Sequence, residues 1–315
     1  MNGALVILGP TASGKTSLAL KIAAKYKAEI ISLDSALIYK GMDIGTAKPS
    51  AAELSSVPHH LIDIIDPRES YSAAQFREDC TRLVGEIQQR GAMPIICGGT
   101  MMYYKALVDG LSPLPKTDAD VRDSIAREAA EVGWPAMHKR LECIDPALYK
   151  KLSPNDKQRV SRALEVFAMT GRPMSSFYEN KGDQCPFLRR EIILLPEEDR
   201  QKLRVVIRQR FMQMLDNGFI DEVRRLHDRG DLSLDLPSMR CVGYRQVWEY
   251  LEGRYHKEEM IELAVIATAR LAKHQMTWLR GGLGALPKGQ SSRLVLSPDA
   301  ADLVERVQSF VEMAS

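Results

Sequence analysis

A glycine-rich segment near the N-terminus has the residue types and spacing of a phosphate-binding loop. It reads GPTASGKT and matches the pattern G-x-x-x-x-G-K-[ST]. The segment follows the apolar run 4–9 and precedes a helical pattern at 16–26, so its N–H groups lie at a helix N-terminus, where they bind phosphate oxygens. We expect Lys15 to neutralise phosphate charge and the Thr16 hydroxyl to bind Mg²⁺. The predicted loop comprises Gly9, Pro10, Thr11, Ala12, Ser13, Gly14, Lys15 and Thr16.

The acid that an ATPase or GTPase needs is missing from its usual place. The apolar run 93–99 ends in CGGT, so it carries no Mg²⁺-binding carboxylate, and no N-K-x-D-like guanine reader occurs. An acid does follow the apolar run 28–33, at Asp34. This carboxylate suits a Mg²⁺ ligand or a general base acting on an acceptor, and capping of a turn is the structural alternative.

A second cation lies on the apolar side of a later helical pattern. The stripe along residues 201–215 includes Ile207, Phe211 and Met214, and at about 100° per residue Arg210 falls within it. An inward-pointing arginine needs an anion, because an unpaired buried charge is costly. A structural salt bridge would supply that anion. A bound pyrophosphate would supply it too and agrees better with the phosphate loop.

Composition and charge narrow the class of protein. The 315 residues are 45% hydrophobic and 27% charged, as in soluble globular proteins, without an apolar run of the ~20 residues that span a membrane. The N-terminus lacks a basic signal-peptide region, and five cysteines without a C-x-x-C pair favour reduced thiols, a cytoplasmic protein and no zinc site. Residues 263–298 contain no Asp or Glu, which fits a nucleic-acid backbone or a solvated helix face. The sequence contains no coiled-coil heptad pattern, so nothing of that kind argues against a monomer.

Alternating strand and helix patterns over the first ~110 residues predict an α/β fold with a mostly parallel, doubly wound sheet. Strands are expected at 4–9, 28–34, 60–66 and 93–99, with helices at 16–26 and 72–91. Ser72 and Gln75 form a capping box, and Gly91 ends that helix.

From residue 117 the pattern becomes helical, with Thr117 and Asp120 as a cap and with Gly133 and Gly171 as stops. A strand resumes at 190–195. The sequence therefore predicts a core formed by 1–116 and 190–315, with a helical insertion at 117–189. Later helices are expected at 199–217, 219–229 and 257–280, followed by a strand at 293–297 and a last helix.

Nine motifs in order along the chain resemble the bacterial tRNA dimethylallyltransferases (tRNA isopentenyltransferases). They are GPTASGKT, DSALIYKGMDIGTAKP, PHHLIDI, YSAAQFR, GGTMMYYKAL, GLSPLP, NDKQRVSRALEV, RCVGYRQVWEYL and AKHQMTWLR. The resemblance is weak only near residues 181–190 and after residue 281. Leu37 stands where many members have glutamine, so we expect no hydrogen bond from that side chain.

The resemblance implies a nucleotide-kinase-like P-loop fold that transfers a dimethylallyl group from dimethylallyl diphosphate to an adenosine N6. That adenosine lies 3′ of the anticodon, at position 37, in tRNAs reading codons that begin with U. In this interpretation Lys15, Arg210, the loop amides and Mg²⁺ on Thr16 stabilise the departing diphosphate. Thr100 donates a hydrogen bond near the bridging oxygen, and Asp34 is the base or a Mg²⁺ ligand.

The resemblance also implies a tRNA surface, and the helical insertion is expected to contact the anticodon stem. The implied contacts are Asp34, Ser35, Ala36, Leu37, Thr100, Arg122, Gln158, Arg159, Val160, Ser161, Arg162, Arg240, Cys241, Val242, Gly243, Tyr244, Arg245, Lys273, His274, Gln275, Met276, Thr277, Trp278, Leu279 and Arg280. Arg159 and Arg162 are three residues apart and share a helix face. Two alternatives remain: an ATP-dependent small-molecule kinase and a nucleotide-gated RNA-binding protein without catalysis.

Overall fold

The computed structural model describes residues 3–178, 184–196, 200–281, 283, 286 and 292–312. The chain divides into two compact units. The larger unit combines Met1–Leu107 with Pro186–Ser315, and the smaller unit is Val108–Cys185. The sequence prediction set these boundaries at 117 and 189. In the part of the chain that is described, no helix is long and apolar enough to cross a membrane.

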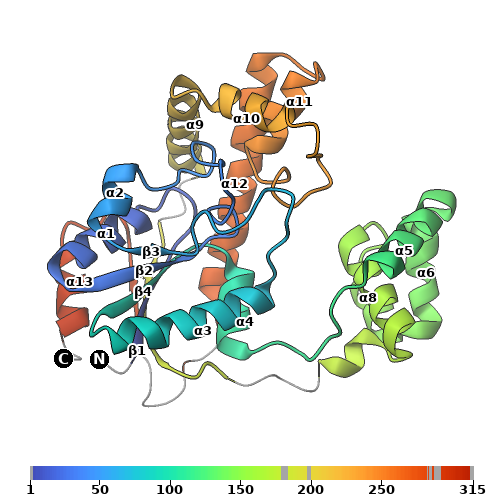
Figure 1. Ribbon diagram of the computed structural model, residues 1–315, viewed down its shortest axis with the longest axis horizontal. Helices are drawn as coiled ribbons and strands as arrows, with labels where there is room; N and C mark the ends of the chain where they lie inside the picture. The colour runs from blue at the N-terminus through green and yellow to red at the C-terminus, as the bar shows by residue number, and fades with distance from the viewer. Residues whose placement is uncertain are drawn as a thin grey trace. The chain divides into compact units, whose positions relative to one another are not determined.

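The larger unit is built on a six-stranded sheet in which every pairing is parallel (Figure 1). The strand order is β3-β2-β4-β1-β5-β6. The bounds are β1 Gly3–Leu8, β2 Ala28–Leu33, β3 His59–His60, β4 Met93–Gly98, β5 Leu188–Leu194 and β6 Ser292–Leu296. All residues of β1 and β2 are buried, as expected for strands covered on both faces. The structure confirms the predicted α/β class.

Helices cover both faces of the sheet and extend beyond its carboxyl edge. They are α1 Lys15–Lys25, α2 Ala51–Ser56, α3 Ala73–Gln89, α4 Met101–Asp109, α9 Arg200–Asp216, α10 Phe219–His227, α11 Tyr244–Leu251, α12 Lys257–Gly281 and α13 Leu303–Glu312. One apolar cluster joins the sheet to α1 and α13 through Ile7, Leu18 and Phe310. A second cluster, with Phe211, Phe219 and Val265, packs α9, α10, α11 and α12 together.

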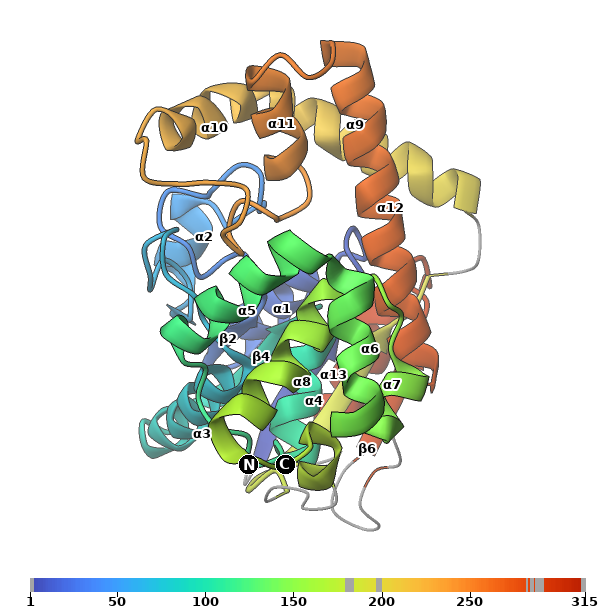
Figure 2. The same cartoon turned by 90° about the vertical axis from the view of Figure 1, so that its right-hand side faces the viewer.

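The smaller unit contains helices and no strand among its described residues (Figure 2). It contains α5 Ala119–Val132, α6 Trp134–Ile144, α7 Pro146–Lys151, α8 Lys157–Thr170 and a 3₁₀ turn at Met174–Phe177. Met137, Leu141, Val160 and Val166 lie in its core. Gly171 caps α8 in the left-handed conformation, as predicted.

Two local predictions need correction. The N-cap of α5 is Asp118, whose side chain accepts the Val121 N–H, and not Thr117. The strand expected at 60–66 is limited to His59–His60, because Leu61 and Asp63 adopt positive φ angles of 61° and 54° and turn the chain out of the sheet. Helices α2 and α11 were not predicted. The capping box of Ser72 at the start of α3 is confirmed.

Candidate active site at the carboxyl edge of the sheet

Three neighbouring strands deliver the main polar residues to one place. Strands β2, β4 and β1 are adjacent and parallel, so the loops after Leu33, Gly98 and Leu8 emerge at the same edge of the sheet. These loops line a pocket of about 700 Å³ in the larger unit. The sequence-predicted Asp34, Thr100 and the loop residues 11–16 all lie on its wall.

The phosphate loop has the tight backbone that its glycines allow. A Cβ on Gly9 would lie 2.3 Å from the Ser13 hydroxyl oxygen and 3.3 Å from the Leu194 Cβ, so only glycine fits there without a shift. Ala12 and Gly14 have φ angles of 66° and 75°. No described side chain caps α1, so its first N–H groups stay available to an anion. The buried Ser13 hydroxyl also lacks a hydrogen-bond partner among the described residues.

Two cations at this site, Lys15 within the loop and Arg210 on α9, have no carboxylate partner among the described residues. The Lys15 ammonium donates to the Pro10 carbonyl at 3.2 Å, and neither Lys15 nor Arg210 forms an ion pair within the described residues. Burial lowers the pKa of both groups, while nearby Asp34 acts in the opposite direction. The structural salt bridge considered for Arg210 is therefore not formed in the described part of the chain. Two under-neutralised cations beside a phosphate loop make a strong anion site.

Two hydrogen bonds hold Asp34 and Thr100 beside each other. The Asp34 Oδ1 atom accepts the Ala36 N–H at 2.9 Å, so the carboxylate does cap a turn, as the structural alternative required. The Thr100 Oγ1 atom accepts the Ser35 N–H at 3.0 Å. These contacts orient both side chains and leave the second Asp34 oxygen without a hydrogen-bond donor among the described residues. That oxygen is suited to accept a proton or bind a cation.

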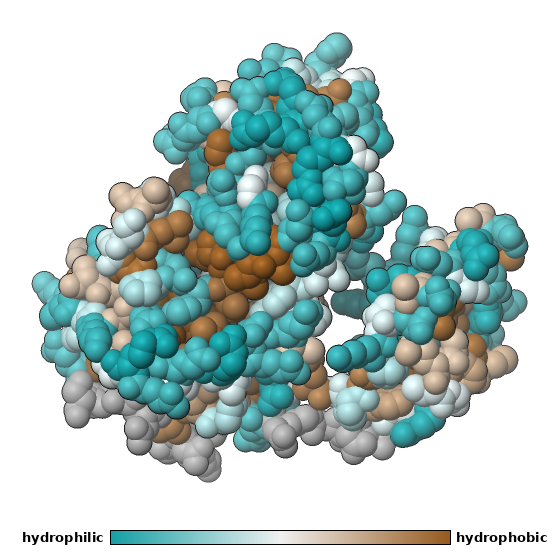
Figure 3. All heavy atoms as spheres, in the orientation of Figure 1, coloured by the Kyte–Doolittle hydropathy of each residue, from teal (hydrophilic) through white to brown (hydrophobic). Residues whose placement is uncertain are grey.

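One part of the pocket wall is apolar. Its lining includes Ile207, Phe211, Met214, Phe219 and Leu271 from α9, α10 and α12. Figure 3 shows apolar side chains gathered on the larger unit where the α9–α12 group faces the sheet. The pocket thus combines an anion-binding end with a compartment suited to a hydrocarbon group.

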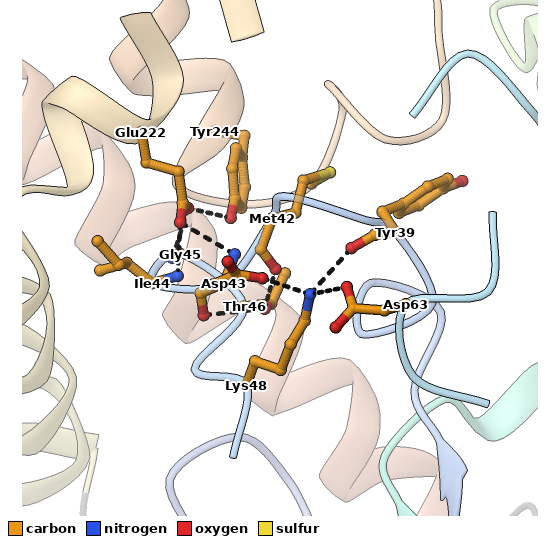
Figure 4. A network of polar contacts seen from close by, with 10 residues as sticks. All are labelled: Tyr39, Met42, Asp43, Ile44, Gly45, Thr46, Lys48, Asp63, Glu222 and Tyr244. Carbon is orange, nitrogen blue, oxygen red and sulfur yellow. Dashed lines mark hydrogen bonds and ion pairs between the residues drawn. The ribbon is translucent and has the colours of Figure 1, made fainter. Parts of the chain in front are cut away.

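A buried carboxylate that sequence reasoning missed shapes one wall of this pocket (Figure 4). Glu222 on α10 is 2% exposed. It accepts the N–H groups of Asp43, Ile44 and Gly45 at 3.0, 2.8 and 3.1 Å, and the Tyr244 hydroxyl at 2.5 Å. A Cβ on Gly45 would lie 2.1 Å from the Phe219 ring, so this loop packs closely against α10.

Lys48 anchors the other end of the same loop. Its ammonium donates to the Tyr39 carbonyl at 3.0 Å and forms ion pairs with Asp43 and Asp63, as Figure 4 shows. Ala47, next to it, has a φ angle of 51°, which is uncommon outside glycine. The two anchors hold the pocket wall formed by Gly45, Thr46 and Ala47 in one conformation. The sequence did offer one sign of this role for Glu222. It is an acid on the buried face of an amphipathic helix, three residues after Phe219.

Only some of the implied tRNA contacts line the pocket. Those that do are Asp34, Ser35, Ala36, Leu37, Thr100, Arg240, Cys241, Val242, Gly243, Tyr244, His274, Gln275 and Trp278. Val160, Tyr244, Met276 and Leu279 are 0%, 0%, 9% and 6% exposed, so they belong to the core, and the RNA contact implied for each of them stays a prediction. Trp278, by contrast, is 37% exposed.

Two arginines of the smaller unit contact a buried acid. Glu165 is 2% exposed and accepts from Arg122, Arg162 and Ser161 at 3.4, 3.2 and 3.1 Å. This arrangement fixes the two guanidinium groups on neighbouring helices. The Arg159 side chain is 73% exposed and pairs with Asp156 on its own helix, so it stays accessible to a phosphate backbone.

A parallel sheet with a phosphate loop at its carboxyl edge places this chain in the class of P-loop proteins. Within that class the chain belongs to the IPP transferase family, whose model matches residues 37–282. It is 55% identical over 277 residues to a tRNA dimethylallyltransferase of Paraburkholderia xenovorans, covering 87% of this chain and 88% of that protein. A tRNA dimethylallyltransferase of Burkholderia thailandensis is 52% identical over 309 residues, covering 97% and 93%.

Two solved structures of tRNA-modifying transferases also resemble this chain. A full-length tRNA isopentenylpyrophosphate transferase from Bacillus halodurans has a TM-score of 0.68 at 34% identity, with 99% of this chain and 96% of that one covered. A eukaryotic dimethylallyltransferase described as acting on tRNA has a TM-score of 0.79 at 25% identity, with 100% and 79% covered.

Proposed function

We propose that this protein transfers a dimethylallyl group from dimethylallyl diphosphate to N6 of the adenosine 3′ of the anticodon, giving N6-(dimethylallyl)adenosine and diphosphate. The observation that carries the proposal is the pocket itself. Its phosphate loop, Lys15 and Arg210 suit a diphosphate, and the adjoining wall of Phe211, Met214 and Leu271 suits a five-carbon hydrocarbon. The tRNA dimethylallyltransferases that the chain resembles at 52–55% identity support this donor and acceptor.

The first requirement of the reaction is to stabilise a departing anion. Breaking the allylic C–O bond leaves negative charge on diphosphate and positive charge on the allyl group. Lys15, Arg210 and the N–H groups at the start of α1 are in place before the bond breaks, so they stabilise the charge without reorganisation. Thr100 lies beside Asp34 on the pocket wall, and its hydroxyl is assigned a hydrogen bond to the bridging oxygen.

The second requirement is to remove one proton from the attacking amine. The exocyclic N6 of adenine is a weak acid, so its proton needs to leave only as the C–N bond forms. Asp34 is assigned this role through the oxygen that does not accept the Ala36 N–H. The carboxylate then holds the proton, while diphosphate leaves from the same allyl carbon that forms the bond to N6, on the side opposite the incoming amine.

The residues present also fit a magnesium ion. Mg²⁺ prefers oxygen ligands, keeps several waters and binds through one or two protein groups together with substrate phosphates. The Thr16 hydroxyl and the Asp34 carboxylate both line the pocket, and the described residues hold no cluster of three or more His, Cys, Asp or Glu side chains. When bound, Mg²⁺ would neutralise diphosphate charge. Thr16 is the first-choice ligand and Asp34 the second.

The acceptor base must leave the stacked anticodon loop before it can reach Asp34. Exposed residues at the pocket, among them His274 and Trp278, are assigned to the unstacked loop, where aromatic stacking and hydrogen bonds to base edges operate. In the smaller unit, the proposed contacts to the anticodon stem are Arg122, Arg159 and Arg162. Phosphate contacts of this kind make tRNA affinity fall steeply with salt.

The donor distinguishes this proposal from the kinase alternative. The protein is incubated with Mg²⁺ and unmodified tRNA, in one tube with dimethylallyl diphosphate carrying a label in the allyl group and in another with γ-labelled ATP. We expect label in RNA only in the first tube. Label from ATP on a small acceptor, with none from the diphosphate, would identify a kinase. Binding of tRNA without transfer from either donor would identify an RNA-binding protein without catalysis.

A further inference from the structure

One side chain joins the two loops on which the proposed chemistry depends. The Oε1 atom of Gln275, on α12, accepts the Thr11 N–H at 2.8 Å, and its Nε2 atom donates to the Gly99 carbonyl at 3.0 Å. Thr11 belongs to the phosphate loop after β1, and Gly99 directly precedes Thr100 after β4. A single amide therefore connects the phosphate loop to the loop that carries Thr100.

The surroundings are adapted to this connection. A Cβ on Gly99 would lie 2.7 Å from the Gln275 Nε2 atom and 3.0 Å from the Gly9 carbonyl oxygen, so the amide approaches the backbone closely because residue 99 is glycine. The Gln275 amide accepts one bond through its oxygen and donates the other through its nitrogen, and glutamine carries this group at the end of a side chain of the required length. Loss of the amide would leave a partly buried N–H and a partly buried carbonyl without partners, which is costly.

We infer that Gln275 is a positioning residue for the phosphate loop. The sequence motif had implied a direct tRNA contact instead. The inference rests on the proposed function for the identity of the anion. Gln275 acts through Thr11 and Gly99. It thereby sets the distance between the phosphate-loop N–H groups, which hold the diphosphate, and the Thr100 hydroxyl, which is assigned to the bridging oxygen. Its removal changes diphosphate binding and leaves RNA binding in place.

The test compares Gln275→Leu with Gln89→Leu, which makes the same change at an exposed glutamine at the end of α3. Affinity for inorganic diphosphate in Mg²⁺ is measured by titration calorimetry, and affinity for an unmodified anticodon stem–loop by fluorescence anisotropy. We expect Gln275→Leu to weaken diphosphate binding about tenfold, the effect of losing about one hydrogen bond, and to change RNA affinity less than twofold. Gln89→Leu should change neither.

A loss of RNA affinity that equals or exceeds the loss for diphosphate would overturn the inference, and so would unchanged binding of both. Thermal unfolding of each variant shows whether it folds. If Gln275→Leu does not fold, Gln275→Asn replaces it. Asparagine keeps the amide but is one methylene too short to reach both loops, so it should also weaken diphosphate binding. Failure of the unchanged protein to bind diphosphate would refute the proposed function, whereas wild-type affinity in the Gln275 variants would refute only this inference.

Discussion

Replacing Arg210 by methionine should separate the stability of the protein from its affinity for diphosphate. The guanidinium is half-buried, burial lowers its pKa, and no described carboxylate pairs with it. Removing this charge therefore removes a desolvation cost, and methionine can pack along the apolar stripe with Ile207 and Met214. We expect the free energy of unfolding to stay constant or to rise by up to ~1 kcal/mol, a Tm increase of at most ~3 °C for a chain of this size.

Binding should change in the opposite direction. A charge-assisted hydrogen bond contributes about 1.5–3 kcal/mol, so losing the Arg210 guanidinium should weaken diphosphate binding roughly 10- to 150-fold. Turnover should fall further, on the order of 10²-fold or more, because charge on the leaving group grows in the transition state. Titration calorimetry with inorganic diphosphate, steady-state kinetics and scanning calorimetry measure the three quantities.

The matched control is Arg204→Met, which removes an exposed arginine from the same helix and should leave all three quantities nearly unchanged. Loss of 3 kcal/mol or more of stability in Arg210→Met, with diphosphate affinity preserved, would refute the reasoning. It would show that Arg210 satisfies a structural carboxylate and does not serve the ligand.

Three further predictions concern acids with different roles. Asp34→Asn should lower turnover at least ~10²-fold while inorganic diphosphate affinity stays within about threefold, as calorimetry and kinetics can show. Glu222→Gln should lower the free energy of unfolding in urea by about 2–4 kcal/mol, because an amide N–H would face the N–H donors of the 43–45 loop. Arg90, the largest cause, and His60 lower the pKa of Glu29 to about 2. Its stabilising effect relative to Glu29→Gln, measured by urea unfolding, should be complete above about pH 4.5 and fade as the pH falls toward 2.

Each of these predictions has a contrary outcome. A collapse of diphosphate affinity in Asp34→Asn would assign that carboxylate to Mg²⁺ and not to proton transfer. Wild-type stability of Glu222→Gln would mean that the loop at 43–45 does not depend on its anchor. A difference between wild type and Glu29→Gln that stays constant down to pH 2 would exclude the ion pair with Arg90 as its source.

Local patterns predicted much of the site. The phosphate loop is contiguous, and the acid at Asp34 directly follows an apolar strand, so spacing alone revealed both. Their convergence followed from parallel strands, whose carboxyl ends meet at one edge. The inward position of Arg210 followed from helical periodicity, and the structure confirms that it lines the pocket.

Contacts between distant residues could not be predicted in this way. Glu222 holds N–H groups 177 to 179 residues earlier in the chain, and Gln275 reaches Thr11 across 264 residues. In both cases the side chain is an ordinary helix residue until tertiary packing supplies its partners. The strand expected at 60–66 failed for a related reason: its apolar pattern was adequate, but Asp63 turns toward Lys48 and leaves the sheet.

The most direct test of the proposed transfer uses two anticodon stem–loops that differ in one functional group. One carries adenosine 3′ of the anticodon, and the other carries purine riboside, which lacks N6. Each is incubated with the protein, Mg²⁺ and dimethylallyl diphosphate, and its nucleosides are analysed by mass spectrometry. We expect one dimethylallyl group on that adenosine and none on the purine riboside substrate. Modification of both substrates, or of neither while diphosphate binds, would contradict transfer to N6.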